Sequence, residues 1–277
     1  MAGFAPIPIR EVFDRVTRGF GYDPATVAYS PAERERVADL VNDALALAWR
    51  RAMWPALMEV RRIAYRPLWE EGAAYAAGDE VFHSGHYWRA LSPTSLAPTS
   101  TSADDWQCDP PDFLPSFPFV ANAIDEVDLE ACVYAAHPAR SRDPRPYPCR
   151  RTDWGAVVAS EDYPLLPFVR YRPLPPRYTW ANTTPSDTPG ACWFDEATGE
   201  CMARLPDGSA AALPFPVMFL GFVVRYASAC RLRDEDGRAE ALAEAWAELD
   251  RAQDAAEEGV RAPRRAAARF TQRRTHA

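Results

Sequence analysis

The sequence predicts an α+β protein in which a discontinuous α-helical bundle, made of N-terminal helices and a C-terminal αα-hairpin, carries small inserted β modules. Helical periodicity is strong in residues 1–65 and again in residues 216–259. The chain between these ends is rich in proline and in short β-prone runs, which favours edge strands and loops over a large sheet. Because each helical end has one apolar face, we expect the two ends to bury those faces against each other.

The N-terminal half of the expected bundle has two clear helices. The first spans residues 8–18, and the second begins after Ser30, which can form a capping box with Glu33. Pro55 should end or kink the second helix, and a further helical stretch is expected over residues 56–63. The residues expected to pack in the bundle from this half are Val37, Leu40, Val41, Leu45 and Trp49.

The C-terminal half of the bundle is expected to be two helices joined by a short turn. Pro216 can start the first helix, and the acidic stretch 234–237 should break it. Gly259 is the expected end of the second helix. The packing residues expected from this half are Phe222, Tyr226, Leu242, Trp246 and Leu249.

Residues 260–277 form a basic arm that contains six arginines and no acidic residue, although the whole chain has a net charge of −8. We expect the arm to be disordered in the isolated protein and to make a local contact with an acidic partner surface. The acidic remainder of the chain argues against a general nucleic-acid binder. The arginines of the arm are Arg261, Arg264, Arg265, Arg269, Arg273 and Arg274.

The middle of the chain divides into two predicted insertions, residues 66–109 and residues 110–215. In the first, residues 79–83 and 86–90 flank the dipeptide Ser84-Gly85, which is a hairpin signal. The second insertion is rich in proline, and its β content should be confined to short pieces. Its strand candidates are residues 127–135, 156–159, 168–171 and 192–194.

A second, degenerate hairpin is expected over residues 190–204, whose glycine-containing pattern can be aligned with residues 78–89. Cys192 and Cys201 could face each other across it. The N-terminus lacks a signal-peptide pattern, which favours cytosolic synthesis and therefore free thiols. No apolar run approaches the length of a membrane helix, so no membrane contact is expected.

Six aromatic residues mark the first insertion: Trp69, Tyr75, Phe82, Tyr87, Trp88 and Trp106. Together with Gly78-Asp79 and Gly85, their spacing resembles that of the small carbohydrate-binding modules of bacterial chitinases, and the resemblance implies their fold. In those modules, exposed tryptophans that stack on sugar rings follow the position of Ala90, whereas this chain has Leu91-Ser92-Pro93 there. Packing or decoration is therefore favoured over glycan binding.

The sequence contains no P-loop and no G-x-S-x-G, G-x-G-x-x-G or H-E-x-x-H motif. His83 and His86 could suggest a metal site together with Cys132 and His137, but no acid or further cysteine completes a recognisable ligand set. Surface histidines are therefore expected. The sequence predicts no enzyme, no cofactor and no metal site.

The helical parts at the two ends of the chain resemble a second family of proteins. Residues 37–62 and 219–257, with the extended run 169–178, are similar to the head-to-tail adaptor (connector or neck) proteins of tailed bacteriophages. The resemblance implies a virion protein, assembled in the host cytoplasm, that forms a dodecameric ring in the neck. Such a ring would dock on the portal protein through the basic arm, join tail or neck proteins below, and let double-stranded DNA pass during genome ejection. The alternative is a glycan-binding adhesion or decoration protein that uses residues 66–109.

Overall fold

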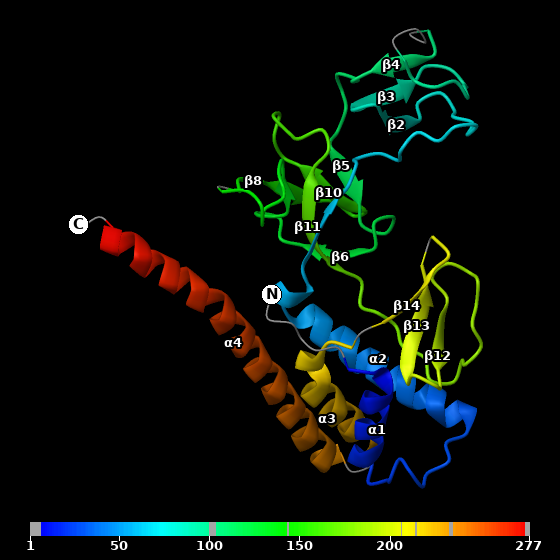
Figure 1. Cartoon of the computed structure of the whole chain (residues 1–277), viewed down its shortest axis with the longest axis vertical. Helices are drawn as coiled ribbons and strands as arrows, with labels where there is room; N and C mark the ends of the chain where they lie inside the picture. The colour runs from blue at the N-terminus through cyan, green and yellow to red at the C-terminus, as the bar shows by residue number, and fades with distance from the viewer. Residues whose placement is uncertain are drawn as a thin grey trace. The chain divides into compact units, whose positions relative to one another are not determined.

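The computed structural model describes residues 7–99, 104–142, 144–205, 207–213, 215–232 and 235–274, and for residue 235 and residues 259–274 it describes the backbone alone. Within these residues the chain is a mixed α+β protein, as the sequence predicts, and it has four α-helices and several small antiparallel sheets (Figure 1). The chain divides into two compact units. Met1–Ala56 and Pro175–Ala277 form the first, which we call the helical unit, and Leu57–Leu174 form the second, the β unit.

The first two helices belong to the N-terminal part of the helical unit. α1 spans Ile9–Gly19 and α2 spans Pro31–Arg51. The predicted capping box is present: the Ser30 hydroxyl oxygen accepts a hydrogen bond from the Glu33 backbone N–H, and the Glu33 carboxylate accepts one from the Ser30 N–H. These bonds satisfy backbone donors that the first turn of a helix leaves unpaired, so they fix the start of α2.

Two further helices come from the C-terminal part. A 3-10 turn, Val217–Phe219, leads into α3, which spans Leu220–Arg231. α3 contacts α1, α2 and α4. α4 spans Glu235–Arg274, and its N-terminal half lies along α3 (Figure 1).

Aromatic contacts join the N-terminal and C-terminal parts of the helical unit. The ring centroids of Trp49, on α2, and Phe219 are 6.3 Å apart. Those of Phe222, on α3, and Trp246, on α4, are 5.1 Å apart. The guanidinium of Arg51 lies over the Trp246 ring, 5.8 Å from its centroid. Side chains from the two ends of the sequence therefore share one interior.

α4 is longer than the sequence analysis predicts. We expected the helix to end at Gly259, but its backbone stays helical through Gly259 to Arg274. Alanine, glutamate and arginine surround Gly259 and have high helix propensity, and one glycine costs only about 1 kcal/mol relative to alanine. The helix also continues through Pro263, whose cost of about 3 kcal/mol this propensity does not explain. The backbone of residues 260–274 is therefore a helical extension rather than a disordered tail. Gly237, expected in a break, lies in the first turn of α4.

A small sheet also belongs to the helical unit. The sequence analysis placed all of residues 110–215 in one insertion, whereas the chain from Pro175 onwards lies in the helical unit. The degenerate hairpin is present, but the expected facing of Cys192 and Cys201 is wrong. The register places Cys192 opposite Ala203 and Phe194 opposite Cys201, and both cysteines are free. The strands of this sheet, in pairing order, are β12 (Cys192–Asp195), β13 (Glu200–Arg204) and β14 (Ala210–Ala212).

Residues 56–63 are not a helix, contrary to the prediction. After a 3-10 turn at Pro55–Leu57 the chain forms strand β1, Glu59–Arg62. β1 pairs antiparallel with β11, Phe168–Pro173, a strand far along the sequence. The helical prediction depended on local spacing alone, and pairing with a distant strand overrides such a weak local preference.

Two sheets form the larger part of the β unit. One has the strand order β1–β11–β7–β8, with β6 also paired to β11, and the other has the order β5–β10–β9. The single strand candidate 127–135 is two strands, because a turn at Asp128–Ala131 separates them. The remaining bounds are β5 Ser116–Pro118, β6 Ile124–Val127, β7 Val133–Tyr134, β8 Pro146–Tyr147, β9 Cys149–Arg151 and β10 Gly155–Val158.

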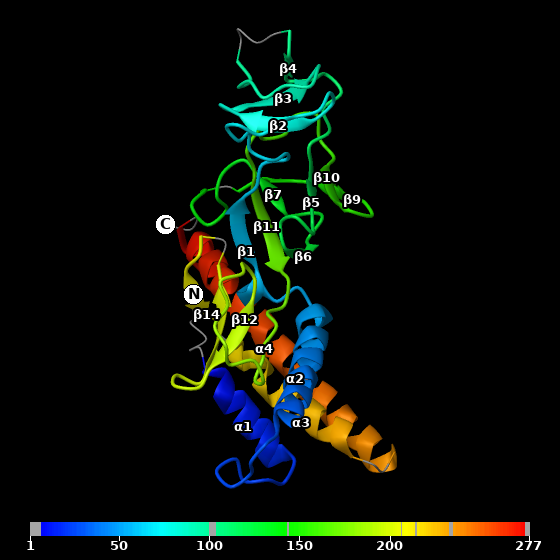
Figure 2. The same cartoon turned by 90° about the vertical axis from the view of Figure 1, so that its right-hand side faces the viewer.

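A third sheet of the β unit contains the predicted hairpin. It consists of β2 (Glu80–His83), β3 (His86–Ala90) and β4 (Trp106–Cys108), paired antiparallel in that order (Figure 2). Ser84 and Gly85 connect β2 to β3 with φ angles of 50° and 89°. Two successive left-handed residues form the tight turn that matches the twist of a hairpin, and a glycine at the second position reduces its strain.

The two faces of the β2–β3–β4 sheet pack differently. Trp88 and Trp106 lie in a small core on one face. Tyr87 belongs to the core of the rest of the β unit. Its hydroxyl donates to the Leu165 carbonyl oxygen at 2.6 Å and accepts from the Tyr65 backbone N–H at 3.1 Å. The sheet therefore has a small core of its own and is joined to the rest of the β unit through Tyr87.

Candidate functional site

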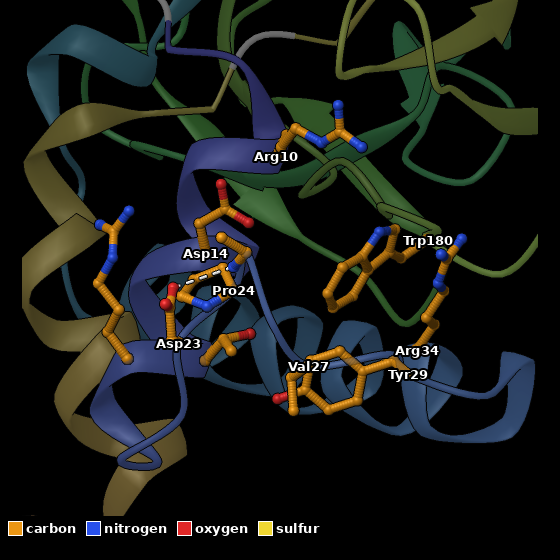
Figure 3. Close-up of a pocket in the computed structure, with 11 residues that line it drawn as sticks. Arg10, Asp14, Asp23, Pro24, Val27, Tyr29, Arg34 and Trp180 are labelled. Atoms are coloured by element: carbon orange, nitrogen blue, oxygen red, sulfur yellow. Dashed lines mark hydrogen bonds between the residues drawn. The ribbon is translucent and has the colours of Figure 1, made fainter.

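The helical unit contains a pocket of about 390 Å³ (Figure 3). α1 contributes Arg10, Asp14 and Arg18 to its wall, the loop between α1 and α2 contributes Asp23, and Trp180 closes another side. The lining therefore carries both signs of charge. Because α1 and the loop are adjacent in sequence and Trp180 is not, the pocket exists only when the N-terminal and C-terminal parts fold together.

Trp180 forms the aromatic wall of the pocket. Its ring stacks on Phe13 with a centroid distance of 4.7 Å and 8° between the planes, and the Tyr29 ring approaches it edge-on at 5.4 Å. The Arg34 guanidinium lies 5.7 Å from the centroid of the Trp180 ring and pairs with Glu196 at 3.1 Å. A cation is thus held beside an aromatic face, an arrangement suited to a flat or anionic group.

Three buried polar atoms on residues lining this pocket have no hydrogen-bond partner in the part of the chain that the structure describes. They are the Thr17 hydroxyl oxygen, the Tyr29 hydroxyl and the Arg34 Nε. An unpaired buried polar atom costs about 1–3 kcal/mol. These three atoms therefore reduce the stability of this part of the helical unit.

Asp14 is the carboxyl group of the pocket whose titration is perturbed. Burial raises its pKa above the ordinary value, while the nearby guanidinium groups of Arg10 and Arg18 act in the opposite direction and are outweighed. No histidine, cysteine or serine is among the described residues that line the pocket. The described lining offers carboxylates, guanidinium groups and an aromatic face.

The six aromatic residues of the first insertion are not exposed. Tyr87, Trp88 and Trp106 are buried, and Trp69, Tyr75 and Phe82 are half-buried. The indole N–H of Trp88 donates to the His83 carbonyl oxygen at 3.2 Å, and that of Trp106 donates to the Leu96 carbonyl oxygen at 3.1 Å. A sugar platform needs an open ring face. These side chains instead supply the packing of the sheet.

The ten residues predicted to pack between helices lie inside the helical unit. Val37, Val41, Leu45, Trp49, Phe222 and Leu249 are buried, and Leu40, Tyr226, Leu242 and Trp246 are half-buried. The sequence analysis missed Trp54, which is buried and donates its indole N–H to the Ala48 carbonyl oxygen at 2.8 Å. Trp54 follows the end of α2, so helical periodicity could not identify it.

The arginines of the basic arm lie on the last turns of α4. Arg261, Arg265, Arg269 and Arg273 recur every fourth residue of that helix, and residues at this spacing share a helix face. The side chains of all six predicted arm residues, Arg264 and Arg274 included, are outside the described part of the structure.

The histidines considered in the sequence analysis do not assemble with Cys132. The sulfur of Cys132 lies instead 3.1 Å from the sulfur of Cys149, and the His137 ring packs edge-on against Phe168. Among the described residues, the metal-ligating side chains that do come together are His86, Cys108 and Asp109. The sequence analysis missed this group, because the pairing of β3 with β4 creates it and no short-range spacing signals it.

Comparisons with protein-family models, with curated proteins and with solved structures gave no match to this chain. In the described part of the chain, no helix combines the length and the apolar character needed to cross a membrane.

Proposed function

We propose that this chain is a structural protein of a tailed-phage neck, a ring-forming head-to-tail adaptor that docks on the portal, extends the DNA channel and joins the tail. The observation that carries the proposal is the composition of the helical unit, in which Met1–Ala56 and Pro175–Ala277 form one compact body. We interpret that body as a discontinuous helical bundle, and Leu57–Leu174 as material inserted into it. This is the organisation that the resemblance to adaptor proteins implies.

The central position of α3 supports the interpretation as a bundle. α3 contacts both N-terminal helices and α4. Its Phe222 and Val223 are fully buried, and the α2 residue Arg51 pairs with Asp250 of α4 at 3.1 Å. Packing of this kind would make a rigid wall element for a ring, because it ties the ends of the chain to each other.

The docking element of the proposal is the arginine-rich end of α4. A helix presents residues that recur every fourth position as a stripe, and each charge-assisted hydrogen bond to an acidic portal surface would be worth about 1.5–3 kcal/mol. Ring symmetry repeats such contacts around the assembly, so that individually weak contacts add up to firm docking. The acidic remainder of the chain would keep passing DNA from adhering to the channel wall.

Removal of the arm tests the docking role. The full chain and a chain ending at Gly259 are mixed with the portal protein of the same phage, and co-elution is measured by size-exclusion chromatography at low and high salt. We expect the full chain to bind, binding to weaken with salt, and the truncated chain to lose most of it. A truncated chain that binds the portal as well as the full chain would contradict the docking role.

Two double variants distinguish an effect of the arm arginines on portal binding from an effect of the net charge of the chain. Arg265→Gln/Arg269→Gln removes two charges from the arm, and Arg238→Gln/Arg251→Gln removes two exposed charges from the N-terminal half of the same helix. The first variant should weaken portal binding at least about tenfold, since two charge-assisted bonds are lost. The second should bind as the wild type does.

A further inference from the structure

Three side chains that commonly bind transition-metal cations meet at one end of the β2–β3–β4 sheet. They are the His86 imidazole, the Cys108 thiol and the Asp109 carboxylate, and their ligand atoms lie within 4.8 Å of one another. All three residues are exposed, so a dissolved cation can reach them. The β3–β4 register places Trp88 opposite Cys108, and His86 is two positions from Trp88 and therefore on the same face of the sheet.

The backbone holds the Asp109 carboxylate next to the other two groups. Asp109 follows Cys108 directly, and in a regular strand the two side chains would point to opposite faces. Asp109 instead has a φ of 43°, in the left-handed region. Its backbone N–H donates a hydrogen bond to the Tyr87 carbonyl oxygen at 2.7 Å, and its Oδ1 accepts one from the Tyr87 N–H at 3.1 Å. Oδ2 lies 2.8 Å from the His86 Nδ1.

We propose that His86, Cys108 and Asp109 form a binding site for a zinc-class divalent cation. Imidazole nitrogen, thiolate sulfur and carboxylate oxygen are the donors that Zn²⁺ uses in proteins, whereas Mg²⁺ and Ca²⁺ prefer oxygen alone. A bound cation replaces the proton shared by His86 and Asp109 and the proton of the thiol. Three protein ligands leave a fourth tetrahedral position for water or for a donor from another molecule.

The same three residue types could instead form a catalytic cysteine site, but the contacts argue against it. In such a site the imidazole separates the carboxylate from the thiol and takes the thiol proton. Here the Asp109 Oδ2 lies 2.8 Å from the His86 Nδ1, and the Cys108 sulfur lies within 4.8 Å of the ligand atoms of both other residues. The three groups therefore converge on one point and do not form a relay in which the imidazole separates the other two. A cation between them would pair with both anionic ligands.

Cobalt substitution tests the site on the full chain. Co²⁺ is added to the reduced protein, and the near-ultraviolet thiolate-to-cobalt charge-transfer band and the visible bands of tetrahedral Co²⁺ are recorded, followed by competition with Zn²⁺. We expect one equivalent to give both signals and Zn²⁺ to remove them. The charge-transfer band should be lost in Cys108→Ser, and the affinity should fall at least about tenfold in His86→Ala and Asp109→Asn, since even the partners of metal ligands are worth about 10–100-fold.

Matched controls make the result specific. His83→Ala removes a histidine from the same hairpin, and Cys192→Ser removes a half-exposed cysteine from the helical unit, and both should bind Co²⁺ as the wild type does. Asparagine tolerates the left-handed backbone as aspartate does, so Asp109→Asn removes charge without a new conformational cost. A wild type without the charge-transfer band, a band that survives Cys108→Ser, or unchanged affinity in His86→Ala would overturn the proposal.

Thermal unfolding gives a second readout that does not depend on spectra. Ligand that binds only the folded state raises the unfolding temperature, so Zn²⁺ should raise that of the wild type and leave Cys108→Ser unchanged. Equal shifts in both proteins would contradict the site. Neither experiment involves the portal, so its outcome is independent of the proposed neck function.

Discussion

At the scale of single residues, Asp14 is a carboxyl group of the pocket in the helical unit whose burial opposes folding when the group is ionised. Its carboxyl group is partly desolvated at the pocket wall, and burial raises its pKa. The orphaned polar atoms of Thr17 and Tyr29 lie in the same wall. Each of these groups reduces the stability of the folded state, because a buried polar group without a partner costs free energy.

Asp14→Asn should make the protein more stable at neutral pH. A carboxyl group whose pKa is raised by folding opposes folding when it is ionised. That cost is fully present above the pKa of the folded state and absent below the unfolded value of 3.8. The unfolding temperature of the variant should therefore exceed that of the wild type at pH 7, and the difference should shrink as the pH falls towards 3.8.

The control for this prediction is Glu35→Gln, which neutralises an exposed carboxylate on α2. Its unfolding temperature should follow that of the wild type across the same pH range, because exposed charges contribute little. A stabilisation by Asp14→Asn that is independent of pH would show that lost charge is not its cause.

At the scale of elements, α3 is the helix on which the helical unit depends. It contacts α1, α2 and α4, and Phe222 is buried on it against Trp246 of α4. α3 is therefore the helix that the other three helices of the described chain have in common as a packing partner.

Phe222→Ala should destabilise the helical unit by about 3–5 kcal/mol, because it removes a buried ring and leaves a cavity. Urea unfolding followed by far-ultraviolet circular dichroism, which reports mainly on the helices, measures the change. Leu47→Ala, at an exposed position of α2, should change the free energy of unfolding by less than about 0.5 kcal/mol. Similar losses in the two variants would show that α3 has no special place in the unit.

Elements set by local chemistry could be predicted from the sequence. The Ser30–Glu33 capping box and the Ser84-Gly85 turn are formed by residues that touch their own neighbours, so short motifs identify them. Strand β1 could not be predicted, because its conformation depends on pairing with β11, far along the chain.

In the candidate sites, too, features formed by neighbouring residues could be predicted from the sequence, and features formed by distant residues could not. The β-prone runs on either side of Ser84-Gly85 predicted the hairpin. The packing of Tyr87 and Phe82 depends on the rest of the β unit, whereas Trp88 and Trp106 lie in the small core of the sheet itself. The His86–Cys108–Asp109 group depends on the β3–β4 register, and the pocket depends on the approach of Trp180 to α1. Contacts of this range leave no spacing pattern in the sequence.

At the scale of the whole molecule, the chain enters and leaves the β unit on neighbouring strands. β1 begins the unit and β11 ends it, and Glu59 lies opposite Tyr171 in their antiparallel register. Opposed Cα atoms in such a pair are about 4.5–5.5 Å apart. A segment whose ends are this close can be removed with a short linker, because the flanking chain need not move.

Replacement of residues 57–174 by a short Gly/Ser linker should leave the helical unit folded. The shortened chain should keep its helical circular dichroism and unfold cooperatively, and residues 57–174 alone should give a folded β-rich protein. A shortened chain without cooperative unfolding would contradict the view that the two ends of the sequence form a scaffold for an insertion.

The proposed neck role is tested most directly by electron microscopy of the purified full chain mixed with the portal protein of its own phage. The proposal predicts a ring of copies of this chain stacked coaxially on one end of the portal. When residues 260–277 are removed, no such ring should be seen on the portal. Portal particles that remain bare in the presence of excess full-length protein would contradict it.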